Sequence, residues 1–341
     1  RMRLLEVLYG NNWKVELGAE PSALWREYVR LLIARGDTPK AQEVLRRVTD
    51  QRDVLALRVD NRFEALVRAD PTWFEVSAAV DRGIAEWQAI APRFPTKLEP
   101  TVELAYRYMD CGRFADALSL TDAAIARVAS SGNPKEVYED LDDMMNWIRD
   151  IRADALQKLG RWSEAEPELR RAAALPEAGQ PNVSNAINLA FFYVNFSRTD
   201  EALKALGPRL ASGTGLDPDA AMQVRYLLHA IAVTRKNSKA ARESRDYMRE
   251  HQSDALSIFQ EALLVANNMD EAASLAVRRL ESPQLRGDML MEIQEYREPA
   301  LSPLEKRVRD GWRQLRKRPD VRAAVAKVGR IEQFPLPPPQ N

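Results

Sequence analysis

The sequence predicts an all-α protein, built as a solenoid of antiparallel helix pairs. Apolar residues recur at helical spacing along the chain, whereas alternating strand-like runs are essentially missing. A phrase of one helix, Gly-Arg-aromatic and an Ala-rich second helix occurs around residues 112–114 and again around 160–162. Internal repeats with a period of about 20 to 50 residues are typical of solenoids, in which each unit packs on its neighbours.

The N-terminal region, residues 1–97, is expected to hold one degenerate repeat and an irregular insert. Ser22 can cap a helix, and Gly36 ends that helix before the next one opens, which predicts a helix pair at 22–50. The segment 52–70 has the pattern of an irregular helical insert. A long helix is expected at 73–91.

Residues 98–211 carry the clearest repeats, with helix pairs expected at 98–130, 136–175 and 182–211. Residues 212–298 are predicted to hold degenerate pairs at 217–251 and 253–282. Proline and glycine residues separate most of these pairs. Gly36, Gly112 and Gly160 have one role in this scheme: each supplies a left-handed turn between two helices, where a Cβ would cost about 1 kcal/mol.

Residues 299–330 are predicted to form helices that cap the C-terminal end of the stack. The segment 306–322 is rich in basic residues, and Val308, Trp312 and Leu315 form its inner face at helical spacing. Its basic face is either an ordinary solvated surface or a contact for phosphates, lipid headgroups or an acidic partner. Residues 331–341 are a Pro-rich tail, of which 334–339 are expected to be polyproline II or disordered and could dock in an aromatic groove.

The repeats resemble the tetratricopeptide repeat (TPR) family. The matching positions are the family's leucine-small pair, helix A aromatic, turn glycine and small helix B residues; they are Leu104, Ala105, Tyr108, Gly112, Ala117 and Ala124, then Ala153, Gly160, Ala165 and Ala172, then Leu189, Ala190, Tyr193 and Ala202. The phrases at 179–189 and 318–332 also make the chain similar to bacterial TPR-containing proteins, a likeness that implies no particular activity. The resemblance implies a right-handed superhelix whose concave face is lined by the first helix of each pair.

Projecting the helices from their turn residues gives a candidate groove on that concave face. Its expected residues combine aromatic anchors with acids; they are Val102, Tyr106, Met109, Asp110, Trp147, Asp150, Asp154, Lys158, Ile187, Phe191, Val194 and Asn195. Such a mixture suits an extended peptide or an amphipathic helix that carries some positive charge. The alternative is that Trp147 and Phe191 belong to the core between repeats and that the groove is empty or filled by the chain's own termini.

The composition, with 45% apolar and 29% charged residues, is typical of a soluble folded protein. Lys plus Arg and Asp plus Glu both number 50 in 341 residues, a balance that argues against nucleic acid as a partner. The cytoplasm is the expected compartment. The alternative is the periplasm or the exterior after loss of a signal peptide, because the chain begins with Arg1 rather than Met. No apolar run approaches the ~18 residues that span a bilayer.

Catalytic and metal-binding motifs are missing, so the sequence predicts neither an enzyme nor a cofactor. His229 is expected in the core and His251 at a helix end, and Cys111 is expected to pack rather than react. Four asparagines form a separate cluster. Asn182 is expected to cap a helix, while Asn185, Asn188 and Asn195 either bond neighbouring helices or present one or two amides to the groove.

The sequence thus predicts a non-enzymatic helical-repeat scaffold that binds a protein or peptide partner in its concave groove. The alternative is a small-molecule- or peptide-sensing repeat domain of a larger regulatory or envelope protein. The partner's identity and the oligomeric state do not follow from the sequence.

Overall fold

Helices make up nearly all the regular structure of residues 1–177 and 179–339, the part of the chain that the computed structural model describes. The strands of this part are β1 (Glu295–Tyr296) and β2 (Gln333–Phe334), which pair in parallel. The prediction of an all-α protein is confirmed.

The N-terminal helices form a block around the buried Trp25. Its elements are α1 (Met2–Gly10), α2 (Ser22–Ala34), α3 (Thr38–Leu45), α4 (Gln51–Arg58), α5 (Glu64–Ala69) and α6 (Val76–Ile90), with short 3₁₀ turns at Asn61–Phe63, Pro71–Phe74 and Ala91–Arg93. The pair expected at 22–50 is present as α2 and α3. The long helix expected at 73–91 begins only at Val76, because Pro71 and the Asp70 side chain, which accepts from the Trp73 amide, close a separate 3₁₀ turn before it.

In the described part of the chain, five further helix pairs follow α6. Four lie within the ranges expected from the sequence, and the pair expected at 182–211 extends one residue further, to Ser212. The five pairs are α7 (Glu99–Asp110) with α8 (Phe114–Ala129), α10 (Leu141–Lys158) with α11 (Trp162–Ala174), α12 (Val183–Asn195) with α13 (Thr199–Ser212), α14 (Pro218–Thr234) with α15 (Ser238–Glu250), and α16 (Leu256–Val265) with α17 (Met269–Glu281). The short α9 (Pro134–Val137) precedes α10. Some first helices of neighbouring pairs pack on one another, as α7 does on α10 and α14 does on α12 and α16, whereas α12 packs on α11, the second helix of the pair before it.

The turns inside these pairs share one backbone geometry. Gly36, Gly112 and Gly160 have φ of 79°, 80° and 76°, as predicted, and Ser197, Lys236 and Asn267 occupy the same place with φ of 60°, 57° and 57°. In each turn the next residue's amide donates to a carbonyl five residues earlier, for example Arg113 N to Tyr108 O at 2.8 Å and Asn268 N to Leu263 O at 2.8 Å. This bond closes the helix C-terminus.

The C-terminal helices are α18 (Arg286–Glu292), α19 (Pro303–Lys317) and α20 (Pro319–Val328). Ser302 and Glu305 form a capping box that starts α19. The helix buries Val308, Trp312 and Leu315 as predicted. It packs on α16 and α17 and also on α12, while α20 packs on α17. The C-terminal helices therefore contact an earlier pair as well as the last one.

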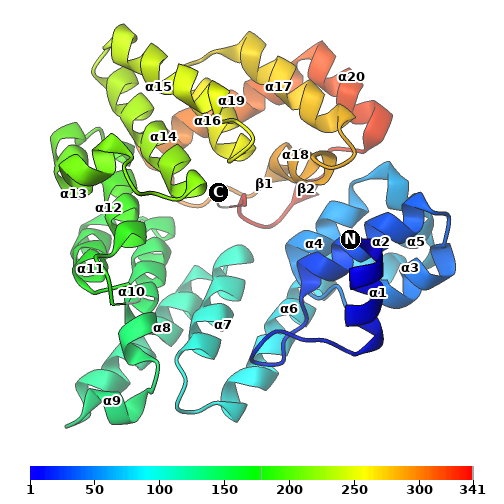
Figure 1. Ribbon diagram of the computed structural model, residues 1–341, viewed down its shortest axis with the longest axis horizontal. Helices are drawn as coiled ribbons and strands as arrows, with labels where there is room; N and C mark the ends of the chain where they lie inside the picture. Colours follow the sequence, from blue (N-terminus) through cyan, green and yellow to red (C-terminus); the bar gives the residue numbers. More distant parts are fainter. Residues whose placement is uncertain (178, 340–341) are drawn as a thin grey trace.

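The two ends of the row of helices meet, because the C-terminal helices contact the N-terminal block, so that the molecule is a ring (Figure 1). Helix α18 packs on α4, the Arg330 amide donates to Val59 O at 3.0 Å, and Arg330 and Glu332 form ion pairs with Glu64 and Arg58 at 2.9 and 2.8 Å. A stack in which each pair touches only its neighbours would leave these ends apart. The closure was not predicted, because it depends on residues about 270 positions apart in the sequence.

The Pro-rich tail turns inward from β2 towards the centre of this ring (Figure 1). Phe334 and Leu336 are buried, and the Arg297 amide donates to the carbonyls of both residues, at 3.1 and 2.9 Å. The expectation of polyproline II or disorder is therefore wrong for residues 334–336, which gain backbone partners from the distant segment 295–297. Residues 340 and 341 lie outside the described part.

Candidate functional site

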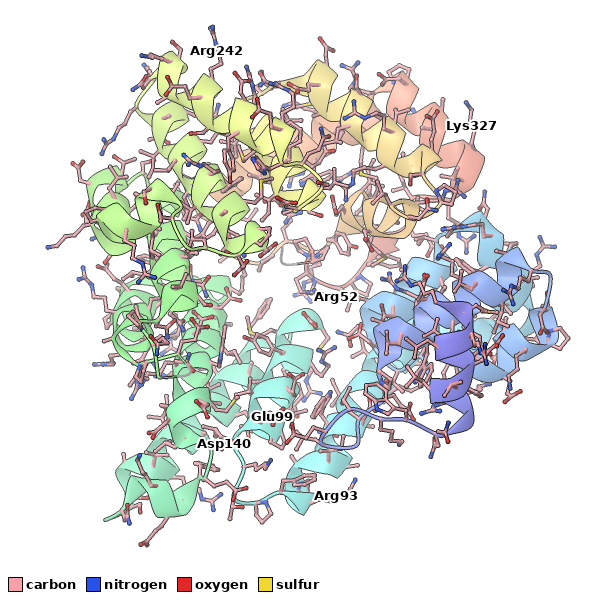
Figure 2. The ribbon with its side chains drawn as sticks, in the orientation of Figure 1. Arg52, Arg93, Glu99, Asp140, Arg242 and Lys327 are labelled. Carbon is pink, nitrogen blue, oxygen red and sulfur yellow. The ribbon has the colours of Figure 1, made fainter. Side chains whose placement is uncertain are left out.

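A cavity of about 340 Å³ lies inside the ring. Its wall comes from the inner sides of α7, α10, α12, α14, α16 and α19 and from the Pro-rich tail. Arg52 of α4 also borders it, where the N-terminal helices face the centre of the ring (Figure 2). The cavity therefore lies among segments that are far apart in the sequence.

Most of the residues expected in the groove do line this cavity. They come from the first helices of the three clearest repeats and are Tyr106, Met109, Asp150, Asp154, Lys158, Phe191 and Asn195. The projection from the turn glycines thus identified one shared surface, although it contained no information on what faces it from the C-terminal helices.

Five expected residues lie elsewhere. Val102, Ile187 and Val194 are 4%, 1% and 1% exposed and belong to the core between helices. Trp147 is half-buried against that core and does not border the cavity. Asp110 points to the N-terminal block, where it pairs with Arg52 and Arg107. Each helix presents only a narrow stripe to the cavity, since its other sides pack on neighbouring helices.

Asp150 is a carboxyl group of the cavity with a strongly raised pKa. The Asn188 side-chain amide donates to both of its oxygens, at 3.1 Å each. Burial, with a smaller effect of the nearby Asp154, raises the pKa of Asp150 to about 7. No cation pairs with this carboxyl group within the described residues. Asp150 therefore presents a negative charge, or a proton to donate, to the cavity at neutral pH.

Lys158 joins the repeat helices to the C-terminal helices at the edge of the cavity. Its Nζ lies 2.9 Å from Glu305 Oε1 and 3.7 Å from Asp154 Oδ1. The Ala300 amide donates to the Lys158 carbonyl at 3.2 Å. Glu305 also accepts from the Ser302 amide at 2.8 Å, so its carboxylate is held by the α19 cap. These contacts fix α19 against the end of α10.

Aromatic side chains form the apolar part of the cavity. The rings of Phe191 and Tyr226 lie 5.6 Å apart, and Tyr226 is 5% exposed. Burial raises the pKa of Tyr106 and of Tyr226, so both hydroxyls stay protonated and can donate. Within the part of the chain that the structure describes, neither hydroxyl has a hydrogen-bond partner.

The Pro-rich tail occupies one side of this space. Pro337, Pro338 and Pro339 line the cavity together with the expected groove residues. A Cβ on Gly112 would lie 3.3 Å from Pro337 Cδ, so the tail runs close to the α7–α8 turn. The possibility that the chain's own terminus fills part of the groove is thus realised.

The sequence missed several residues of this cavity. Tyr226 of α14 and Glu261 of α16 lie outside the range 98–211 from which the groove was projected, and Glu305 and Arg309 were assigned to a cap. Asn188 was found as part of the asparagine cluster, and both it and Asn195 line the cavity. Asn182 caps α12, as predicted, by accepting from the Asn185 amide at 2.8 Å.

The other reactive side chains have structural surroundings. His229 is 1% exposed, with Nδ1 2.9 Å from the Ala241 carbonyl, and His251 stacks on Tyr247. Burial raises the pKa of the Cys111 thiol, which keeps it protonated. Among residues 1–177 and 179–339, no cluster of His, Cys, Asp or Glu side chains is arranged to hold a metal ion, and no helix is long and apolar enough to span a membrane.

Comparison with known proteins does not assign the chain to a family. The sequence matches no protein-family model and no curated protein. Any function must therefore be argued from the cavity and the surfaces around it.

Proposed function

We propose that this protein is a non-enzymatic, TPR-like helical-repeat scaffold that binds an extended segment of a protein or peptide on the inner face of its ring. The observation that carries the proposal is the chain's own tail. Residues 333–334 pair with β1, and Pro337, Pro338 and Pro339 lie in the cavity. An inner face that holds one extended Pro-rich segment in cis has the backbone contacts and pockets that another such segment needs.

The side chains around the tail indicate the kind of segment that would bind. Tyr106 and Phe191 provide flat apolar surfaces, which suit prolines and other apolar side chains. Asp150 adds a carboxyl group that no cation neutralises within the described residues. A partner segment with apolar residues and one positive side chain therefore fits this face best.

The proposal is tested by weakening the tail and supplying it in trans. In the variant Pro337→Ser/Pro338→Ser/Pro339→Ser, Phe334 and Leu336 keep their buried places, but the cavity loses its cis occupant. A labelled peptide with the sequence of residues 337–341 should bind this variant at least about tenfold more tightly than the wild type, since the substituted residues 337–339 no longer compete for the cavity. Fluorescence anisotropy measures both affinities.

Two further substitutions in the same variant locate the binding. Phe191→Ala should weaken the peptide by about tenfold, because Phe191 lines the cavity. Trp147→Ala is the matched control, since Trp147 is a half-buried aromatic residue outside the cavity. Equal losses in both variants, or equal affinity of the wild type and the tail variant, would contradict the proposed site.

A second candidate function is a small-molecule sensor, a repeat domain of a larger regulatory or envelope protein. It is favoured by Tyr106 and Tyr226, whose hydroxyls have no hydrogen-bond partner among the described residues and which line a cavity within the usual size range of ligand pockets, about 300–1,000 Å³. Asp150 would select an organic amine. Calorimetry with 1,5-diaminopentane tests it: binding by the wild type that Asp150→Asn removes supports the sensor, and no heat in the wild type counts against it.

A further inference from the structure

A second hollow, of about 740 Å³, lies between α19 and the segments that carry β1 and β2. Basic side chains dominate it. Arg309, Arg313, Arg316 and Lys317 share one face of α19 at spacings of four, three and one residues, and Arg322 of α20 joins them. This basic face was singled out in the sequence, and the proposed peptide site does not use it, apart from Arg309, which borders both hollows.

The acids of this hollow neutralise only part of its charge. Glu298 pairs with Arg313, which also pairs with Asp310 at 2.5 Å. Glu295 also lines the hollow, yet it forms no ion pair with any of the basic residues there. Within the described residues, Arg309, Arg316, Lys317 and Arg322 have no carboxylate within 4 Å. The hollow therefore holds more positive charge than its own acids balance.

Arg316 is the clearest case of a positive charge in this hollow that has no carboxylate partner among the described residues. It is half-buried, and its Nη1 donates only to the Gln294 carbonyl, at 3.1 Å. Burial lowers the pKa of its guanidinium; the charge of Glu295 opposes this effect, and the neighbouring Arg309 and Arg313 add to it. An anion placed between these side chains would relieve the repulsion and accept charge-assisted hydrogen bonds from them.

We propose that this hollow binds a small anion of the oligophosphate class, carried by an organic molecule of about nucleotide size. Planar guanidinium groups match phosphate oxygens in pairs, and several of them around one hollow favour a ligand with more than one negative charge. The volume lies within the range of small-molecule pockets, about 300–1,000 Å³. Tyr296 and Ile331 line the same hollow and offer an apolar wall to the organic part of the ligand. A concave site of this kind suits a small molecule better than a flat membrane surface.

Isothermal titration at constant ionic strength tests the proposal with two probes, sodium triphosphate and ATP. The wild type should bind both, and Arg316→Gln/Arg322→Gln should bind each at least tenfold more weakly. Arg242→Gln/Lys327→Gln removes two exposed bases from the outer rim of the ring (Figure 2) and should bind as the wild type does. Tighter binding of ATP than of triphosphate would support contact between the organic part of the ligand and the apolar wall of Tyr296 and Ile331. Equal binding would contradict that contact and would restrict the site to the phosphates.

Three outcomes would overturn the proposal. In the first, the wild type binds neither triphosphate nor ATP. In the second, Arg316→Gln/Arg322→Gln and Arg242→Gln/Lys327→Gln weaken binding equally. In the third, the wild type binds vesicles that contain phosphatidylserine but neither of the two probes. The last outcome would assign the basic face to a membrane. Because Arg316 is half-buried, circular dichroism and the melting temperature establish that its variant is folded, and Lys317→Gln/Arg322→Gln repeats the test with exposed residues only. None of the three substituted pairs lines the central cavity, so failure of the phosphate proposal would leave the proposed peptide site untouched.

Discussion

Single turn residues decide how each helix pair is connected. Lys236 and Asn267 adopt the left-handed backbone that glycine supplies in the clearest repeats, with φ of 57° in both. A Cβ in this region costs about 1–2 kcal/mol, less for asparagine than for lysine. The geometry persists without glycine because the closing hydrogen bond is kept, from Asn237 N to Ala232 O at 2.8 Å.

Replacing Lys236 by glycine should therefore stabilise the protein. We expect Lys236→Gly to raise the free energy of unfolding by about 0.5–1 kcal/mol, because the strain at Cβ is removed at an exposed position. Urea denaturation measures it. Lys204→Gly, at an exposed position inside α13, is the control and should lower the stability by about 1 kcal/mol. A loss in both variants would mean that the turn strain is small.

Asp150 is a residue whose surroundings cost stability. Its folded-state pKa is raised from 3.8 to about 7, so the folded protein holds this proton more tightly than the unfolded chain does. The free energy of unfolding therefore falls as the pH rises from about 4 to about 7, and Asp150 causes no further change above that range. At about 1.4 kcal/mol for each pKa unit, the cost of the charged form amounts to at most about 4 kcal/mol.

The variant Asp150→Asn should remove that cost. At pH 8 its melting temperature should exceed that of the wild type by several degrees, and at pH 4 the two should agree within about a degree. The Asn188 amide can still donate to the new side-chain carbonyl. Calorimetry across this pH range measures the difference, and a variant less stable than the wild type at pH 8 would show that the carboxylate is stabilised by its surroundings.

At the scale of elements, a buried ion pair holds α17 to α18. Arg279 and Glu292 are 2% and 6% exposed, and Arg279 Nη1 donates to Glu292 Oε2 at 2.7 Å. The Ser257 hydroxyl of α16 donates to the other carboxylate oxygen at 2.6 Å. Three helices thus meet at one carboxylate, just before the chain turns back towards the N-terminal block.

Removing one partner of this pair should be far worse than removing both. Arg279→Met leaves a buried carboxylate without its cation and should cost about 3–5 kcal/mol, whereas Arg279→Met/Glu292→Met should recover most of that loss. Chemical denaturation of both variants measures the two effects. If the double variant is as unstable as the single one, the pair contributes through packing or through Ser257 rather than through charge.

The sequence predicted those elements whose causes are local. Apolar periodicity and turn glycines placed the helix pairs, and the projection from Gly112 and Gly160 brought Tyr106 and Asp150 to one surface. Trp147 was misplaced, because two sides of an amphipathic helix can both carry large apolar residues and only packing decides between them. Tyr226 and the pairing of the tail with β1 were missed, since both depend on contacts with distant segments.

At the scale of the whole molecule, the closure of the ring depends on one close backbone approach. Gly329 forms an antiparallel bridge with Asp60, and an added Cβ would lie 2.4 Å from the Val59 carbonyl oxygen and 2.9 Å from Leu290 side-chain carbons. Its backbone is extended, with φ of −173°, so the constraint is space rather than conformation. No larger residue fits while α20 stays joined to α4.

Gly329→Ala should therefore open the ring. The clash is with backbone, which cannot rotate away, so we expect a loss of at least about 3 kcal/mol and faster proteolysis in residues 330–339. Gly132→Ala is the matched control, because no atom lies within 4 Å of its added Cβ. Denaturation gives the stability, limited proteolysis with mass spectrometry gives the cleavage sites, and small-angle scattering should show a larger radius of gyration for the opened molecule.

Because the tail enters the cavity from this junction, the same variant should bind the peptide of residues 333–341 more tightly than the wild type. A stable, compact Gly329→Ala protein with unchanged peptide affinity would show that ring closure does not hold the tail in place.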